Sequence, residues 1–260
     1  MRKMITQGFI CLEDKYKFIY KIAQIEYVEW EDGAFNYIFR PFYNIIDLLP
    51  DSLFQGIPGL DLSLRRAVYE RKNMVPTFIL ERSPSEQRED FWMLMEESGV
   101  KAINRLDWLI RTNKRYSGDN FFIIPFVGNE TVTYQKRTMY DLVKRSDSIN
   151  KKLLEIICFG DNLYTDEIVI DDKSRMYYYK LLMPMYIREY EQRKVHRMEG
   201  IEKAKEGNVY KGRRQLKLDP LLFDKVANDY LKGKISLEQA ISILKISRAT
   251  FFRRLKARNN

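Results

Sequence analysis

The sequence has few of the residues that mark whole classes of protein. Its two cysteines, Cys11 and Cys158, give neither a disulfide framework nor a zinc motif. Its single histidine, His196, lies in a basic stretch typical of a helix surface, and we assign it no role. The apolar runs are short and interrupted by charge, with no signal peptide or membrane span among them. We therefore expect a cytoplasmic protein that binds no metal and no cofactor and does not associate with a membrane.

The first 75 residues are rich in aromatic side chains. Residues 22–30 alternate as a strand, Glu31-Asp32-Gly33 supplies a turn, and residues 34–39 return, so a hairpin is expected before Pro41. Aromatic side chains at strand spacing favour a buried core over a nucleic-acid stacking surface. Asp61 is expected to begin a helix that runs through Lys72. The loop at residues 56–59 lacks the Gly-Lys-Ser/Thr ending of a phosphate-binding loop.

Positive charge is concentrated at the end of the chain. Residues 211–260 hold 13 Lys and Arg against 4 Asp and Glu, a net charge of 13 − 4 = +9. The whole chain also carries +9, so residues 1–210 are neutral on balance. A local basic segment of this kind indicates phosphate binding. The alternative is a solvated basic tail on an ordinary three-helix fold.

Local signals place three helices in this basic segment. The first begins at Asp219-Pro220, where a capping residue precedes a first-turn proline, and it ends at Lys232-Gly233, where glycine stops the helix. The second begins at Ser236, which has capping-box spacing to Gln239. The third covers residues 248–258 behind Ser247, with Phe251 and Leu255 directed inward. This spacing leaves a polar face suited to a major groove, formed by Ser247, Arg248, Thr250, Arg253, Arg254 and Lys256.

The middle of the chain alternates strand and helix signals. Residues 75–80 read as a short strand, and residues 88–98 as a helix that stops at Gly99. Between them, Ser83-Pro84-Ser85-Glu86 has the pattern of a helix start, with Ser83 as the cap. Further elements are expected as a helix at 106–112, a buried strand after Gly118-Asp119, a helix at 149–157, a strand near 167–170, and a helix of some thirty residues, about 45 Å long, at 176–205.

Together these motifs resemble the serine recombinases of the resolvase/invertase family. The resemblance is carried by Gly212-Arg213-Arg214 followed by the three helices, by Ser83 and Gln87 after a strand, by Gly118-Asp119 before a strand, and by residues 140–146. It implies that Arg213 and Arg214 form an arm in the minor groove. It also implies that the long helix mediates dimerisation.

The resemblance further implies a set of catalytic residues. Ser83 would attack a DNA phosphate and form a covalent phosphoserine, while arginines balance the charge on phosphorus without a metal. The positions that match the family's pattern are Ser83, Arg82, Asp141 and Arg145, with Arg188 or Arg193 on the long helix. Leu142 stands where the family has an arginine, and Arg82 is one position from the expected place. These two departures favour an alternative, a non-catalytic DNA-binding regulator that retains a recombinase-like dimerisation scaffold.

We therefore expect an α/β protein with three parts. Residues 1–74 would be an N-terminal extension of unknown role, residues 75–206 a resolvase-like catalytic-type domain ending in the long connecting helix, and residues 207–260 an arm with an all-α helix-turn-helix domain. The expected activity is strand cleavage and exchange at a specific DNA site. The expected partners are double-stranded DNA and a second copy of the chain on a palindromic site, with a tetramer on DNA as a further assembly.

Overall fold

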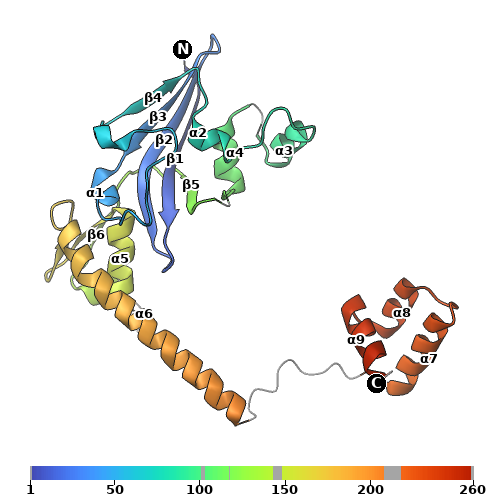
Figure 1. Ribbon diagram of the computed structural model, residues 1–260. Helices are drawn as coiled ribbons and strands as arrows, with labels where there is room; N and C mark the ends of the chain where they lie inside the picture. Colours follow the sequence, from blue (N-terminus) through green and yellow to red (C-terminus); the bar gives the residue numbers. More distant parts are fainter. Residues whose placement is uncertain (1, 101–102, 117, 143–147, 208–217, 259–260) are drawn as a thin grey trace. The chain divides into compact units, whose positions relative to one another are not determined.

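The computed structural model describes residues 2–100, 103–116, 118–142, 148–207 and 218–258 (Figure 1). The chain divides into two compact units, Met1–Lys194 and Val195–Asn260. The described residues form a mixed α/β structure with mainly antiparallel strand pairing and a helical C-terminal region. None of the helices in these ranges combines the length and the apolar content that crossing a membrane requires.

A five-stranded antiparallel sheet forms the centre of the first unit. Its strands are β1 (Arg2–Glu13), β2 (Ile19–Trp30), β3 (Phe35–Pro41), β4 (Tyr69–Lys72) and β5 (Phe121–Pro125), in the order β4-β3-β2-β1-β5. The expected hairpin is confirmed, since β2 pairs with β3 and Gly33 supplies the turn with a φ of +82°. The aromatic side chains of this hairpin lie in the core, as expected, with Tyr37 and Phe39 buried.

Five helices accompany this sheet, namely α1 (Tyr43–Ile46), α2 (Thr77–Leu80), α3 (Phe91–Glu97), α4 (Arg105–Thr112) and α5 (Ile149–Phe159) (Figure 1). Each contributes buried side chains to one large core with β1, β2 and β3. A smaller cluster around Phe9, Cys11 and Phe122 forms a separate apolar group. The helices expected near residues 88–98, 106–112 and 149–157 are confirmed as α3, α4 and α5, and the strand expected after Asp119 is β5.

Two sequence-based assignments in this unit are wrong. Residues 77–80, expected as part of a strand, form helix α2 after Pro76, because a short apolar run carries no periodicity that separates a strand from a buried helical turn. Asp61 caps only a three-residue 3₁₀ turn, Leu62–Leu64. The chain then enters β4, which pairs with β3, instead of continuing as a helix to Lys72.

The expected boundary after residue 74 does not coincide with the division into units. Strand β5 pairs with β1 through contacts such as Ile10 with Ile123, so residues from both sides of that boundary share one sheet. The expected boundary at residue 207 also differs, since the division falls between Lys194 and Val195, inside helix α6 (Arg175–Glu206). Pairing between strands more than 100 residues apart leaves no local mark in the sequence.

A second, three-stranded sheet lies next to α5 in the chain. It consists of β6 (Thr133–Gln135), β7 (Asn162–Tyr164) and β8 (Val169–Ile170), with β6 and β7 parallel and β7 and β8 antiparallel. The strand expected near residues 167–170 is thus present as β8. Gly160 ends α5 with a φ of +80°, and a Cβ there would lie 3.3 Å from Ile45, so this position needs glycine's freedom and its size.

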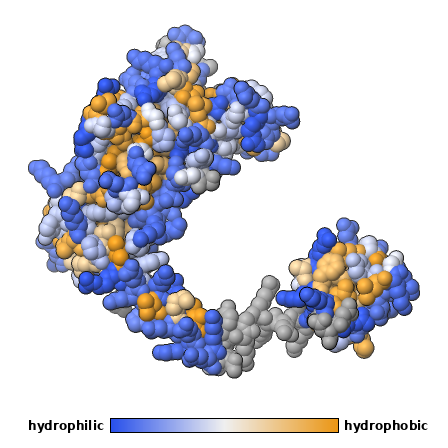
Figure 2. Space-filling view, in the orientation of Figure 1, coloured by the Kyte–Doolittle hydropathy of each residue, from blue (hydrophilic) through white to orange (hydrophobic). Residues whose placement is uncertain are grey.

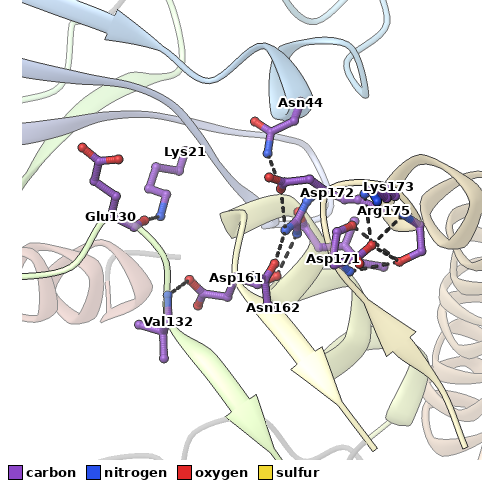
Figure 3. Close-up of polar contacts among 12 residues, drawn as sticks. Lys21, Asn44, Glu130, Val132, Asp161, Asn162, Asp171, Asp172, Lys173 and Arg175 are labelled. Atoms are coloured by element: carbon purple, nitrogen blue, oxygen red, sulfur yellow. Dashed lines mark hydrogen bonds and ion pairs between the residues drawn. The ribbon is translucent and has the colours of Figure 1, made fainter.

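Arg175 ties the start of α6 to this small sheet (Figure 3). Its side chain is fully buried, and its Nη1 donates to the carbonyl oxygens of Ile157 and Asp161 at 3.2 and 2.8 Å. Its Nη2 donates to Asn162 Oδ1 at 2.9 Å, and Asp172 supplies a carboxylate at 3.4 Å. Burial lowers the pKa of Arg175, and Asp172 opposes that effect. The guanidinium therefore fixes where α6 begins.

Lys21 is a second buried cation in this region (Figure 3). Its ammonium donates to the carbonyl oxygen of Glu130 and lies 4.8 Å from the ring centre of Phe159 and 5.0 Å from that of Phe9. Burial lowers the pKa of Lys21, and the charge of Asp161 partly offsets this. The arrangement joins β2 to the loop before β6, so we interpret Lys21 as a structural residue.

The long helix expected at residues 176–205 is confirmed as α6, which continues through Pro184. Leu182, Met183 and Tyr186 are buried in the core of the first unit. Because the chain's own core covers Leu182 and Met183, these two residues of α6 are not available for the dimer contact that the resemblance implies, whereas Met185 is exposed. Every residue from Glu191 to Lys203 is exposed. Figure 2 shows hydrophobic side chains on α6, and Val195, Met198 and Ile201 are exposed apolar residues on the part of this helix that belongs to the second unit.

The second unit ends in three helices, α7 (Pro220–Leu231), α8 (Leu237–Leu244) and α9 (Arg248–Arg258), close to the expected bounds. The expected caps are confirmed, because Asp219 accepts from the Leu221 amide and Ser236 forms a capping box with Gln239. Among the described residues of this unit, a separate small core is formed by Phe223, Val226, Ala227, Ala240, Leu244, Ile246 and Phe251.

Candidate nucleic-acid interface

Helix α9 is held with one face inward. Phe251 is fully buried, and its ring lies 5.8 Å from that of Phe223 and 5.3 Å from that of Tyr230 on α7. Leu255, one turn further, is half-buried against the same core. The inward direction expected for these two residues is therefore confirmed. The remaining sides of α9 carry Arg248, Arg253 and Lys256, all exposed.

The start of α9 is fixed by two hydroxyl groups. Ser247 accepts a hydrogen bond from the Thr250 amide at 3.3 Å, which confirms it as the cap. The hydroxyls of Ser247 and Thr250 also lie 2.9 Å apart and share a hydrogen bond. Arg248, between them, places its guanidinium 5.9 Å from the ring centre of Phe252. The first turn of α9 is thus ordered by its own side chains.

A tight turn joins α8 to α9. Lys245 has a φ of +50°, in the left-handed region that glycine usually occupies, and its amide donates to the Ile241 and Ser242 carbonyls. A non-glycine residue in this region costs about 1 kcal/mol. Ile246 is buried and anchors the turn to the small core. The loop between the two helices is therefore short, and α9 has a fixed direction relative to α8.

One arginine of α9 has a role that the sequence did not suggest. Arg258 lies 3.1 Å from the Asp224 carboxylate and donates to Asn228 Oδ1 at 3.2 Å, so it ties the end of α9 to α7. Asp224 and Asn228 are four positions apart and share one side of α7, which is the only signal that could have predicted this contact. Arg254, expected on the outer face, is half-buried. Arg213 and Arg214 lie outside the described residues.

The residues expected around the nucleophile have structural partners. Ser83 follows α2, and its Oγ donates to the Ile79 carbonyl at 2.8 Å and accepts from Arg105 at 3.0 Å. Helix α3 begins at Phe91 behind Asp90, so the prediction that Ser83 caps the following helix is wrong. Ser83 lies at the end of a helix, where carbonyl oxygens and not amides are free. This position does not favour phosphate binding.

Arg82, expected beside the nucleophile, is buried and faces inward. It forms an ion pair with Asp119 and donates to the Phe78 carbonyl at 2.9 Å. Its guanidinium carbon lies 4.0 Å from the Phe78 ring centre. Burial lowers the pKa of Arg82, while Asp119 and Glu81 oppose that effect. These contacts of Arg82 join α2 to the turn before β5.

The other expected catalytic residues have contacts of their own. Asp141 lies in a 3₁₀ turn, Met139–Leu142, and accepts from the Thr138 amide at 2.9 Å. Arg193 pairs with Glu189 at 2.8 Å along α6, and Arg188 is exposed on the same helix. Arg145 lies outside the described residues. Within the described ranges, no hydrogen bond or ion pair joins Ser83 to Asp141, Arg188 or Arg193.

Sequence reasoning missed Arg105, which organises the loop around Ser83. Its Nη1 donates to Ser83 and to the Pro84 carbonyl, and its Nη2 pairs with Glu86 at 2.7 Å. The side chain is buried, yet the sequence presents it only as the first residue of a helix after Asn104. Buried arginines of this kind are recognised only when the loop that they hold is known.

Comparisons with models of protein families, with curated proteins and with solved structures give no match. The resemblance to serine recombinases therefore remains a prediction from sequence motifs.

Proposed function

We propose that this chain is a DNA-binding protein that inserts α9 into the major groove of double-stranded DNA. The observation that carries the proposal is the construction of the second unit. A capped helix, packed by Phe251 onto a small core, exposes Arg248, Arg253 and Lys256. The three helices lie within residues 211–260, the segment that carries a net charge of +9. A helix held on a compact support, with cations outward, has the size and charge that a major groove accepts.

Two of the exposed cations are suited to phosphate contacts. Arg253 and Lys256 lie further along α9 than the first turn, where side chains reach past the base edges toward the backbone of the duplex. Contacts of this kind position a protein without reading sequence. The first turn, with Ser247, Arg248 and Thr250, then lies nearest to the bases, as the first turn of a helix in the groove commonly does.

Strand cleavage is the less favoured function. The serine recombinase mechanism needs a serine hydroxyl free to attack phosphorus and arginines turned toward the same phosphate. Ser83 is instead hydrogen-bonded to Ile79 and Arg105, and Arg82 is paired with Asp119. These contacts favour the alternative, a DNA-binding regulator without strand cleavage.

The proposal is tested by the salt dependence of binding. The full chain is titrated onto duplex DNA of random sequence at several salt concentrations, and the slope of log affinity against log salt is measured. Each phosphate neutralised contributes about −0.9 to that slope. The variants Arg253→Ala and Lys256→Ala are each expected to bind all sequences more weakly and to reduce the steepness of the slope by about 1.

The matched control is Lys72→Ala, which removes the same charge from an exposed side chain of β4 in the first unit. It is expected to leave affinity and slope unchanged. Absence of duplex binding at low salt, or a slope that is the same for all four proteins, would overturn the proposal.

A further inference from the structure

Arg248 differs from the other cations of α9 in its surroundings. It is exposed in the first turn of α9, and its guanidinium lies over the Phe252 ring at 5.9 Å. Within the described residues no carboxylate pairs with it, whereas Arg258 is paired with Asp224. The charge and the donors of Arg248 are therefore available to a ligand, while its position is restricted by an aromatic ring one turn away.

The neighbours of Arg248 leave it as the strongest donor in the first turn. Ser247 and Thr250 share a hydrogen bond between their hydroxyls and a second one through the Thr250 amide. Ala249 is exposed and has no polar side-chain atom. A small side chain beside Arg248 lets the helix approach the floor of a groove closely, so the guanidinium is the group that reaches the base edges first.

The ring of Phe252 lies against the Arg248 guanidinium and restricts its position. Its ring lies 5.7 Å from that of Phe251 and 6.4 Å from that of Tyr230, so it is attached to the core of the unit although it is partly exposed. A cation held over an aromatic face loses less conformational freedom when it binds. The planar guanidinium presents paired donors, whereas a lysine ammonium presents a point charge.

We propose that Arg248 makes this protein selective for guanine, by donating two parallel hydrogen bonds to O6 and N7 of one guanine in each recognised site. In the major groove only guanine offers two acceptors side by side on one base, and a guanidinium matches their spacing. The inference rests on the proposed function and extends it, because it names the base that the first turn of α9 reads.

The test is a selection from a library of random duplexes with the full chain, followed by binding measurements on the selected site. The wild-type protein is expected to select a guanine at one fixed position. Changing that base pair is expected to weaken binding by about 5- to 150-fold, the range for a bidentate contact. For Arg248→Ala the same change is expected to alter affinity less than about twofold, and Arg248→Lys is expected to lose most of the discrimination.

Two further variants separate base reading from other effects. Lys225→Ala removes an exposed positive charge from α7 of the same unit and is expected to keep the wild-type base preference. Phe252→Leu is expected to reduce discrimination at the guanine position alone, with the helical content of the protein checked by circular dichroism.

The outcomes distinguish this inference from the proposed function. If the wild-type chain binds no duplex, both fail. If it binds without selecting a sequence, or if Arg248→Ala keeps the full penalty at every position, the proposed function stands and the assignment of Arg248 fails. Loss of the penalty at one guanine, in Arg248→Ala and not in Lys225→Ala, is the result expected.

Discussion

The contacts of Ser83 bear on the choice between the two functions that the motifs suggest, strand cleavage and DNA binding without cleavage. A nucleophilic serine must present a free hydroxyl, but Ser83 Oγ donates to the Ile79 carbonyl and accepts from Arg105. We expect Ser83→Ala to lower the free energy of unfolding of the first unit by about 1–2 kcal/mol, because a hydrogen bond to a buried charged group is lost. Equilibrium unfolding in urea measures this.

The matched variant is Ser85→Ala at an exposed position, expected to change stability by less than about 0.5 kcal/mol. Neither variant is expected to alter DNA binding. A covalent adduct between the wild-type protein and DNA that disappears in Ser83→Ala would contradict this view and would support the recombinase interpretation.

The two cysteines are expected to be chemically inert in the folded protein. Burial raises the pKa of the Cys11 thiol to about 12, and burial also raises the pKa of Cys158. Because the thiolate is the reactive form, almost none is present at pH 8, and both side chains are fully buried. Mass spectrometry after treatment with iodoacetamide at this pH is expected to find no label on the native protein and two labels in guanidinium. Stoichiometric labelling of either cysteine in the native protein would contradict the expectation.

At the scale of the element, the helices of the second unit were predictable because their signals are local. Asp219 with Pro220, Ser236 with Gln239, and Ser247 each mark a helix start within a few residues. The large sheet was not predictable in full, because β1 is held by pairing with β2 and with the distant β5, and the sequence near β1 does not show the second of these pairings. The exposed positions of Arg248, Arg253 and Lys256 on α9 could be predicted from the spacing of the inward-facing Phe251 and Leu255. The contact between Arg258 and Asp224 could not, because it depends on how α7 packs against α9.

The capping box of α8 gives a prediction at the same scale. The Ser236 hydroxyl accepts from the Gln239 amide at 3.2 Å, and Gln239 Oε1 accepts from the Ser236 amide at 2.8 Å. We expect Ser236→Ala to destabilise the second unit by about 1 kcal/mol. Ser242→Ala, at an exposed position inside α8, is expected to leave stability unchanged or slightly higher.

The tryptophans allow this effect to be assigned to one unit. Trp30, Trp92 and Trp108 all lie in the first unit. The midpoint followed by tryptophan fluorescence is therefore expected to stay the same in Ser236→Ala, while part of the circular dichroism signal is lost at lower denaturant concentration. Equal shifts in both signals would show that the two units unfold together.

At the scale of the whole molecule, the described residues of the two units are packed around separate cores. The first unit has one large core around its sheet, and the three C-terminal helices have a small one. The division between the units falls inside α6, where residues 191–203 are exposed on every side. An isolated helix of this length is marginal in water, so partner contacts are the expected source of its stability.

We expect these exposed turns of α6 to pair with the same turns of a second copy, which would present two α9 helices to a palindromic site. Met198 and Ile201 are three positions apart and share a side of α6. Ile201→Glu would bring two like charges into that contact, so the dimer dissociation constant is expected to rise by about 100-fold or more. Gln192→Glu adds the same charge nine positions earlier, about 180° around the helix, and is expected to leave the dimer intact. Analytical ultracentrifugation of the three proteins, free and with duplex DNA, measures the effect. A wild-type protein that stays monomeric under both conditions would rule out pairing through α6.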